Sequence, residues 1–201
     1  MPVKIIDKNN FPKVVESLKS TQGTVEAGVL ASAGSSLLTI ANANEFGAEI
    51  SPKNSKWLTI PLRDELKGKS ARDFSLQFVH PKGKGYALLV QRNGSEIVPF
   101  YLLVKHITIP ERAFIRGTFD RSSTIDRLVK IAEKLIDRAL NGKSVLVLDA
   151  IGEEFVSMVK ERINNGDFKK NSPITVNMKG GSIPLYDTGA LRDHITYQVK
   201  R

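Results

Sequence analysis

The sequence predicts an α+β fold, in which a mixed or antiparallel sheet packs against two long helices and a β-hairpin insertion interrupts the core. Three observations lead to this prediction. Two long segments after residue 121 repeat apolar residues with helical periodicity, and the stretch 51–105 alternates β-rich runs with turns. Shorter strand-like segments lie near both ends of the chain. We therefore expect a core domain formed by residues 1–50 and 106–201, with the insertion at 51–105.

Residues 1–50 are expected to supply a helix, a strand and a second helix. In the segment NNFPKVVESLKS, Asn is a possible N-cap and Pro12 stands in the first turn, as at many helix starts. The residues TVEAGVLA (24–31) favour a short strand. The segment SSLLTIANANEFG (35–47) favours a helix that ends at Gly47, because glycine commonly follows the last helical residue.

The expected insertion consists of β-rich runs separated by Gly-, Pro- and Lys-containing turns. The runs are WLTIPL, DFSLQFV, YALLVQR and VPFYLLVKHITI. The turns between them contain KGKG and RNGS, and Asn93-Gly94 is a strong hairpin signal.

The last part of the chain predicts two long helices followed by strands. Apolar residues in 123–142 fall on one helical face, and Gly142 is the expected stop. The segment 144–167 predicts the second long helix. SPITVNMKG (172–180) and ITYQVKR (195–201) are expected to form strands.

The charge balance is strongly basic, with 30 Lys and Arg against 21 Asp and Glu and a net charge of +9. Such a surplus favours contact with phosphate backbones or acidic protein surfaces, so a basic nucleic-acid-binding protein is one class to consider. The basic residues are nevertheless spread along the chain, which favours an ordinary solvated surface. The chain has no cysteine, which excludes disulfides, thiolate chemistry and Cys-based metal sites. No run approaches the ~20 apolar residues of a membrane span, so we expect a soluble protein.

The tripeptide Asp187-Thr188-Gly189 raises the possibility of an aspartic protease, which needs two carboxylates that share a proton. Only fourteen residues follow Asp187, too few to build the flap and the sheet that bury such a pair. A turn is the better interpretation: Asp187 would cap the segment ALRDHI, and Gly189 would allow the tight backbone. The three histidines lie far apart, and no Gly-rich phosphate loop has the required spacing. We therefore expect no enzyme activity, no metal and no cofactor.

Three segments resemble a known family when they are taken together. VKHITIPERAFIRGTFD (104–120) is similar to the x-IP-x-R-x-F-hR signature of phage virion-morphogenesis proteins, the neck and tail-completion family of Mu-like and related tailed phages. NSPITVNMKGGSIPLYDTGALRDHITYQV (171–199) resembles the same family's PL-x-D-T-G-x-L-x-x-S-I-x-Y-x-V pattern, and LTIANANEFGAEI (38–50) resembles its A-x-x-x-E-F-G helix end. The segments follow the family's order and cover about half of the chain. The sequence departs from the pattern at Ala113, where many members have Pro, and at His194, where many have Ser.

The resemblance implies a structural virion protein of a tailed phage or phage-like particle that completes the tail or neck and joins head to tail. It implies a homo-oligomeric ring, expected to be a hexamer, with head connector or adaptor proteins and tail tube or terminator proteins as partners. Non-specific contact with DNA is a further expectation, and no membrane is involved. The protein would be assembled in the host cytoplasm and reside in the virion. The family-motif and interface candidates are Glu45, Phe46, Gly47, Ile109, Pro110, Arg112, Phe114, Arg116, Pro184, Leu185, Asp187, Thr188, Gly189 and Leu191.

The central motif also carries expectations that follow from its own residues. Pro110 should end the preceding strand, because it has no N–H to donate. Arg112 and Arg116 are four residues apart and would share a helical face, either to pair with carboxylates of a neighbour or as part of a simple amphipathic turn. Phe114 and Ile115 would anchor this helix to the sheet. The hairpins of 51–105 are expected to make the contacts between neighbouring copies in the ring. The basic surplus would face acidic connector or tail subunits, or DNA, and the sequence does not choose between them.

Overall fold

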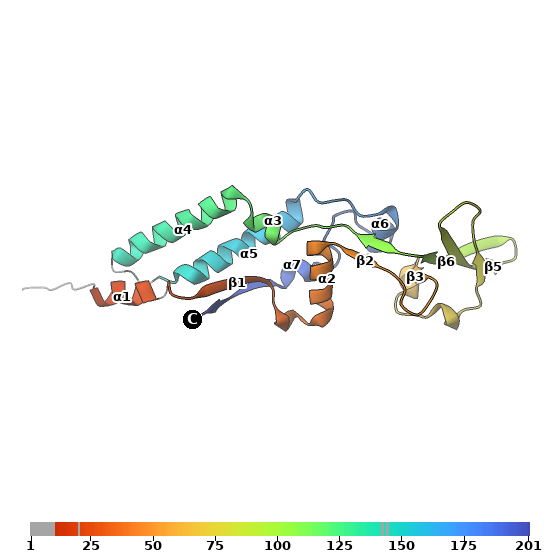
Figure 1. Ribbon diagram of the computed structural model, residues 1–201, viewed down its shortest axis with the longest axis horizontal. Helices are drawn as coiled ribbons and strands as arrows, with labels where there is room; N and C mark the ends of the chain where they lie inside the picture. The colour runs from red at the N-terminus through yellow and green to blue at the C-terminus, as the bar shows by residue number, and fades with distance from the viewer. Residues whose placement is uncertain (1–10, 20, 142, 144) are drawn as a thin grey trace, which may run out of the picture. The chain divides into compact units, whose positions relative to one another are not determined.

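The computed structural model describes residues 11–19, 21–141, 143 and 145–201 and confirms the α+β class, with helices and antiparallel strands throughout (Figure 1). The chain divides into two compact units. The first contains 1–45, 113–167 and 188–201, and the second contains 46–112 and 168–187. The expected insertion, 51–105, thus lies within the second unit, which also takes in residues on both sides of it and a later segment. None of the helices in the described parts of the chain is long and apolar enough to cross a membrane.

The first unit has three layers, and Figure 1 shows α5 between α4 and a two-stranded ribbon. The ribbon pairs β1 with β8 in antiparallel register, from Thr24 opposite Lys200 to Val29 opposite Ile195. The elements of this unit are α1 (Phe11–Lys19), β1 (Thr24–Val29), α2 (Ser35–Phe46, whose last residue belongs to the second unit), α3 (Arg116–Phe119), α4 (Ser122–Leu140), α5 (Val147–Asn165), α7 (Ala190–Asp193) and β8 (Ile195–Lys200).

Helix α5 forms the core of the first unit because it is covered on two sides. Its buried residues are Val147, Gly152, Phe155, Met158, Val159 and Ile163. Gly152 is required there by packing, since an added Cβ would lie 2.6 Å from Cγ of Tyr197 on β8. The ribbon can therefore approach the helix closely.

The second unit contains a four-stranded antiparallel sheet of order β3-β6-β5-β4 and a small ribbon that pairs β2 with β7. Its elements are β2 (Ala48–Ile50), β3 (Leu58–Pro61), β4 (Gln77–Val79), β5 (Tyr86–Asn93), β6 (Glu96–Val104), β7 (Ile107–Ile109) and α6 (Pro173–Lys179). Leu66, Phe100 and Tyr101 form the core of the sheet, and Phe74 and Leu89 pack against them. The predicted hairpin at Asn93-Gly94 is confirmed: Asn93 pairs with Glu96, and Gly94 has φ +63° in the turn.

One element prediction is wrong: 172–180 forms helix α6 and not a strand. The β-branched residues in this segment favour a strand, but the two ends of the segment favour a helix. Ser172 Oγ accepts a hydrogen bond from the backbone N–H of Thr175 at 3.2 Å, and Pro173 occupies the first helical position. Gly180 ends the helix in the left-handed conformation, with φ +66°. The predicted N-cap Asn before Pro12 and the stop at Gly142 lie outside the described residues.

Candidate functional site

The central feature of the family-like segments is a buried carboxylate, that of Glu45, in the last turn of α2. Its side chain is only 5% exposed. Oε2 accepts hydrogen bonds from the backbone N–H groups of Phe114 at 2.8 Å and Ile115 at 3.0 Å, and Oε1 accepts one from Arg116 at 2.8 Å. These groups lie at the start of α3, where backbone N–H groups have no partner within the helix. Glu45 therefore caps α3 from a position about seventy residues earlier in the sequence.

The residues that follow fix α3 within the first unit. Phe114 is fully buried, and its carbonyl oxygen accepts a hydrogen bond from Thr118 Oγ1 at 2.6 Å. A Cβ at Gly28 on β1 would lie 3.2 Å from Cδ1 of Ile115, so Ile115 lies against that strand. The expected anchoring to the sheet is therefore confirmed for Ile115, and Phe114 is buried, whereas the side chain of Arg116 is exposed.

Arg112 is the buried centre of a second hydrogen-bond network, in the second unit. Its side chain is 7% exposed, Nε donates to the carbonyl oxygen of Lys169 at 2.9 Å, and Nη2 donates to Oδ1 of Asn171 at 3.1 Å. Asn171 in turn donates from Nδ2 to the carbonyl oxygen of Ile183 at 3.4 Å. Burial lowers the pKa of the Arg112 guanidinium from its ordinary value. Through these hydrogen bonds to uncharged oxygen atoms, Arg112 holds the 168–187 segment in place.

The prediction that Arg112 and Arg116 share a helical face is wrong. Helix α3 begins at Arg116, and the backbone at Arg112 is not helical. Glu45 sets this boundary, because it accepts hydrogen bonds from the N–H groups of 114–116. Those N–H groups would otherwise bond to carbonyl groups four residues earlier and extend the helix toward its N-terminus. Pro110 behaves as expected: β7 ends at Ile109, directly before it.

Gly47 joins α2 to β2 and is required by its backbone. Its φ is +75°, and an added Cβ would lie 3.1 Å from the backbone nitrogen of Glu111. The predicted helix end at Gly47 is confirmed, and Ala48 pairs directly with Ile109. Phe46, which precedes Gly47, is 61% exposed.

The Asp-Thr-Gly segment forms a turn, as predicted, but its capping residue differs from the prediction. Helix α7 follows Gly189, whose φ is +87°, and Oγ1 of Thr188 accepts a hydrogen bond from the N–H of Ala190 at 3.3 Å. The predicted cap at Asp187 is wrong: the residue is exposed, and Gly189 occupies the cap position. The hydrophobic candidates on either side, Leu185 and Leu191, are 8% and 6% exposed, and Pro184 is half-buried.

The family-like segments coincide with places where the chain passes from one compact unit to the other. These passages fall after Glu45, Arg112, Asp167 and Asp187. Three of the four residues belong to the motifs quoted from the sequence. The motif residues therefore fix the backbone where it leaves or enters a unit.

Sequence reasoning missed a basic pocket of about 520 Å³ in the first unit, lined by residues of α3, α4 and α5. Arg121, Arg127 and Arg162 line it together with Glu161 and Asp167. Arg127 forms ion pairs with Glu154 and Glu161. Burial lowers the pKa of Arg162, the neighbouring Arg121 lowers it further, and the carboxylate of Glu45 acts in the opposite direction. No sequence motif marks these residues, because they come together only through the packing of the helices.

The described residues contain no group of three or more His, Asp and Glu side chains that could hold a metal ion. His80, His106 and His194 lie in separate parts of the chain, and each is exposed.

No protein-family model, no curated protein and no solved structure matches this chain.

Proposed function

We propose that this protein is a non-enzymatic structural component of a tailed phage or phage-like particle, which completes the tail or neck and joins head to tail as a ring oligomer. The observation that carries the proposal is the way the three family-like segments use their polar residues. Glu45 of the first segment binds the backbone of 114–116 in the second. Arg112 of the second binds Asn171, the first residue of the third, and Lys169, which lies two residues before it.

This observation supports the resemblance because short motifs found by chance have no reason to contact one another. Here each polar contact joins residues more than fifty positions apart and is buried or partly buried. Long-range contacts of this kind are expected where separate segments of the sequence together stabilise one fold. These contacts support the proposal.

A ring requires heterologous contacts, in which one surface of a copy meets a different surface of the next. Several large apolar side chains of both units are more than half exposed, among them Phe78, Ile97, Phe119 and Leu140. The net charge of +9 suits acidic connector or tail subunits, or the DNA that passes through the ring. The proposed partners are therefore further copies of the chain, a head connector or adaptor, and a tail tube or terminator protein.

The proposal is tested by measuring the mass of the purified protein by light scattering behind a sizing column, at low and moderate salt. A hexameric ring would have about six times the 22.2 kDa of one chain and would be visible as a ring in negative-stain electron micrographs. A protein that remains a monomer at every concentration and salt would contradict the ring.

The rival class, a basic nucleic-acid-binding protein, is tested on the same sample with generic duplex DNA. Such a protein loses affinity steeply as salt rises, because binding releases counterions from the phosphates. A monomer that binds DNA tightly with a steep salt dependence would favour the rival. A ring that binds DNA weakly would favour the virion protein.

A further inference from the structure

Helix α4 carries more apolar surface than the rest of its unit covers. Ala132, Leu135 and Ala139 pack with Val147 and Ile151 around α5. A second set of apolar residues remains exposed: Ile125 by 41%, Val129 by 48%, Ile136 by 37% and Leu140 by 58%. At about 100° per residue these four fall within about 60° of the helix circumference. They form one continuous strip, named here the α4 stripe, that runs nearly the length of the helix.

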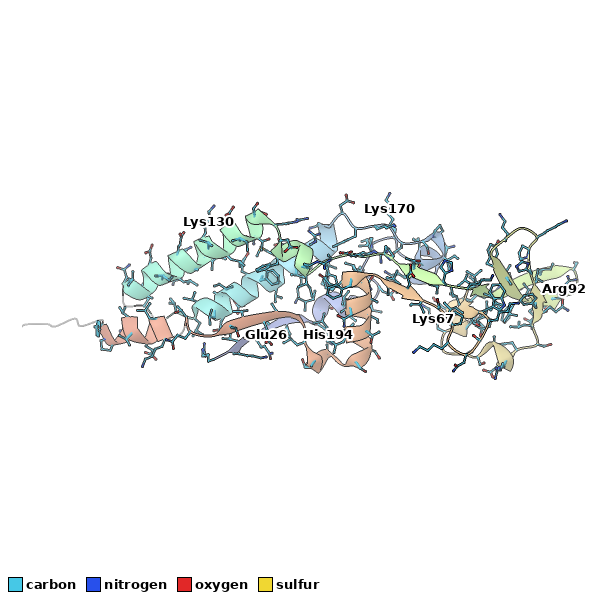
Figure 2. All side chains as sticks on the ribbon, in the orientation of Figure 1. Glu26, Lys67, Arg92, Lys130, Lys170 and His194 are labelled. Atoms are coloured by element: carbon cyan, nitrogen blue, oxygen red, sulfur yellow. The ribbon has the colours of Figure 1, made fainter. Side chains whose placement is uncertain are left out.

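An acidic row borders the α4 stripe on the side away from α5. It consists of Asp126, Glu133 and Asp137, which the helical repeat places about 50° to 90° from the centre of the stripe. Each of these residues is exposed, and none forms an ion pair within the described parts of the chain. The basic residues of α4, among them Lys130 (labelled in Figure 2), lie further round the helix. The stripe therefore suits a partner surface that is both apolar and basic.

A second copy of this strongly basic chain fits that description, but a twofold contact between two α4 helices does not. In an antiparallel twofold pair the same edge of each stripe meets its copy, so the two acidic rows would face each other and repel. In a parallel twofold pair the acidic row would meet the opposite edge, which packs against α5. The stripe is therefore expected to meet a different surface of the second copy, which is the heterologous contact that a ring requires.

The tip of the β5–β6 hairpin has the matching chemistry. Arg92 and Ile97 are direct cross-strand partners there, so their side chains lie side by side on one face of the sheet. Ile97 is 52% exposed, and Pro99, two residues on and on the same face, is exposed as well. Glu96 points to the opposite face, because side chains alternate along a strand. Figure 2 shows Arg92 in this hairpin.

We propose that the α4 stripe of one copy binds the β5–β6 hairpin tip of a second copy, with Ile97 on Val129 and Ile136 and with Arg92 beside Glu133. This inference rests on the proposed ring. It names the two surfaces through which neighbouring copies in the ring would contact each other. Apolar contact supplies the attraction, and the acidic row attracts Arg92 and so fixes the position of the tip along the helix.

Cross-linking tests the pairing, and the absence of native cysteines makes each introduced thiol unique. Full-length Val129→Cys is mixed with an Ile97→Cys variant that carries a mass tag, and a short bismaleimide is added. Because each variant carries a single thiol, every mixed dimer is a cross-link between one chain of each variant. The matched control replaces Val129→Cys by Lys134→Cys, an exposed position on the same helix about 140° away from Val129.

The expected result is a mixed dimer of the Val129→Cys and Ile97→Cys chains that forms at least about tenfold faster than the mixed dimer of the Lys134→Cys control with Ile97→Cys. A predominance of dimers between two Val129→Cys chains would overturn the heterologous pairing. If light scattering shows a ring but the mixed dimer forms no faster than the control, the inference fails while the proposed function stands. If the protein is a monomer throughout, both fail.

A charge exchange gives a second, independent readout. Glu133→Arg alone and Arg92→Glu alone should each weaken self-association on the order of tenfold, because attraction becomes repulsion. The two changes in one chain should restore association to within about threefold of the original. Lys134→Glu, which changes a charge outside the acidic row, should leave association unchanged. Failure of the double variant to recover, with both singles folded by circular dichroism, would refute the assignment of Arg92 to Glu133.

Discussion

Replacement of Glu45 by glutamine tests the buried cap of α3 with the smallest possible change in shape. The carboxylate receives three backbone hydrogen bonds of 2.8, 3.0 and 2.8 Å at a side chain that is 5% exposed. An amide keeps one acceptor oxygen, but its NH₂ group would face a backbone N–H, so at least one bond is lost and one buried donor is left unpaired. The remaining bonds lose the contribution of the negative charge.

The expected loss of unfolding free energy is about 3 kcal/mol, from ~1.5–3 kcal/mol for a charge-assisted bond and ~1–3 kcal/mol for a buried unpaired donor, with partial relaxation. For a domain stabilised by ~5–15 kcal/mol, such a variant still folds but is clearly weakened. Guanidinium denaturation followed by far-UV circular dichroism measures it, because the long helices α4 and α5 lie in the same unit as Glu45.

Glu49→Gln is the matched control, since Glu49 is exposed and only four residues away. It should change the unfolding free energy by less than about 0.5 kcal/mol. A Glu45→Gln variant as stable as the Glu49→Gln variant would refute the capping role.

Three further predictions concern single contacts elsewhere in the two units. Gly152→Ala should lower the unfolding free energy by about 2 kcal/mol in the same denaturation assay, because its Cβ would overlap the Tyr197 ring; unchanged stability would contradict the close packing. The hydrogen bond from Lys200, 2.6 Å long, lowers the pKa of Glu26, so its contribution to stability should be present above the ordinary carboxyl pKa and disappear as pH falls through the lowered value. Melting curves between about pH 6 and pH 3 test this, and Glu26→Gln should flatten that part of the pH dependence. Arg112→Lys should lower the unfolding free energy by about 2 kcal/mol, because one ammonium group does not replace the guanidinium fork; a variant with wild-type stability would show that the fork is dispensable.

The sequence predicts those elements whose cause is local. Helix α4 follows from its own apolar periodicity, the β5–β6 hairpin from Asn93-Gly94, and the end of α2 from Gly47. The failure at α6 is also local, because two signals compete there. The β-branched residues favour a strand, but a Ser172 cap, Pro173 and a left-handed Gly180 together determine the outcome.

The candidate site is harder to predict because its contacts are long-range. Sequence spacing places Arg112 and Arg116 one helical turn apart, but Glu45 takes the N–H of Arg116 and begins the helix there. Nothing near Glu45 in the sequence indicates a partner about seventy residues away. The basic pocket around Arg162 has the same origin, since packed helices bring its lining together.

A residue that belongs to a family-like motif is not for that reason an interface residue in this protein. Glu45, Arg112 and Phe114 are all buried and occupied by contacts inside their own unit, so they are not available to a neighbouring copy. A surface for assembly must come from side chains that folding leaves exposed, and the α4 stripe is made of such side chains. Folding and assembly should therefore separate by mutation. Changes at Glu45 or Arg112 should lower the stability of the chain, whereas changes at Val129 or Glu133 should leave the stability intact and reduce association alone. If stability and association instead fell together in every variant, the same residues would have to serve both purposes, and the distinction between a structural motif and an assembly surface would not hold for this protein.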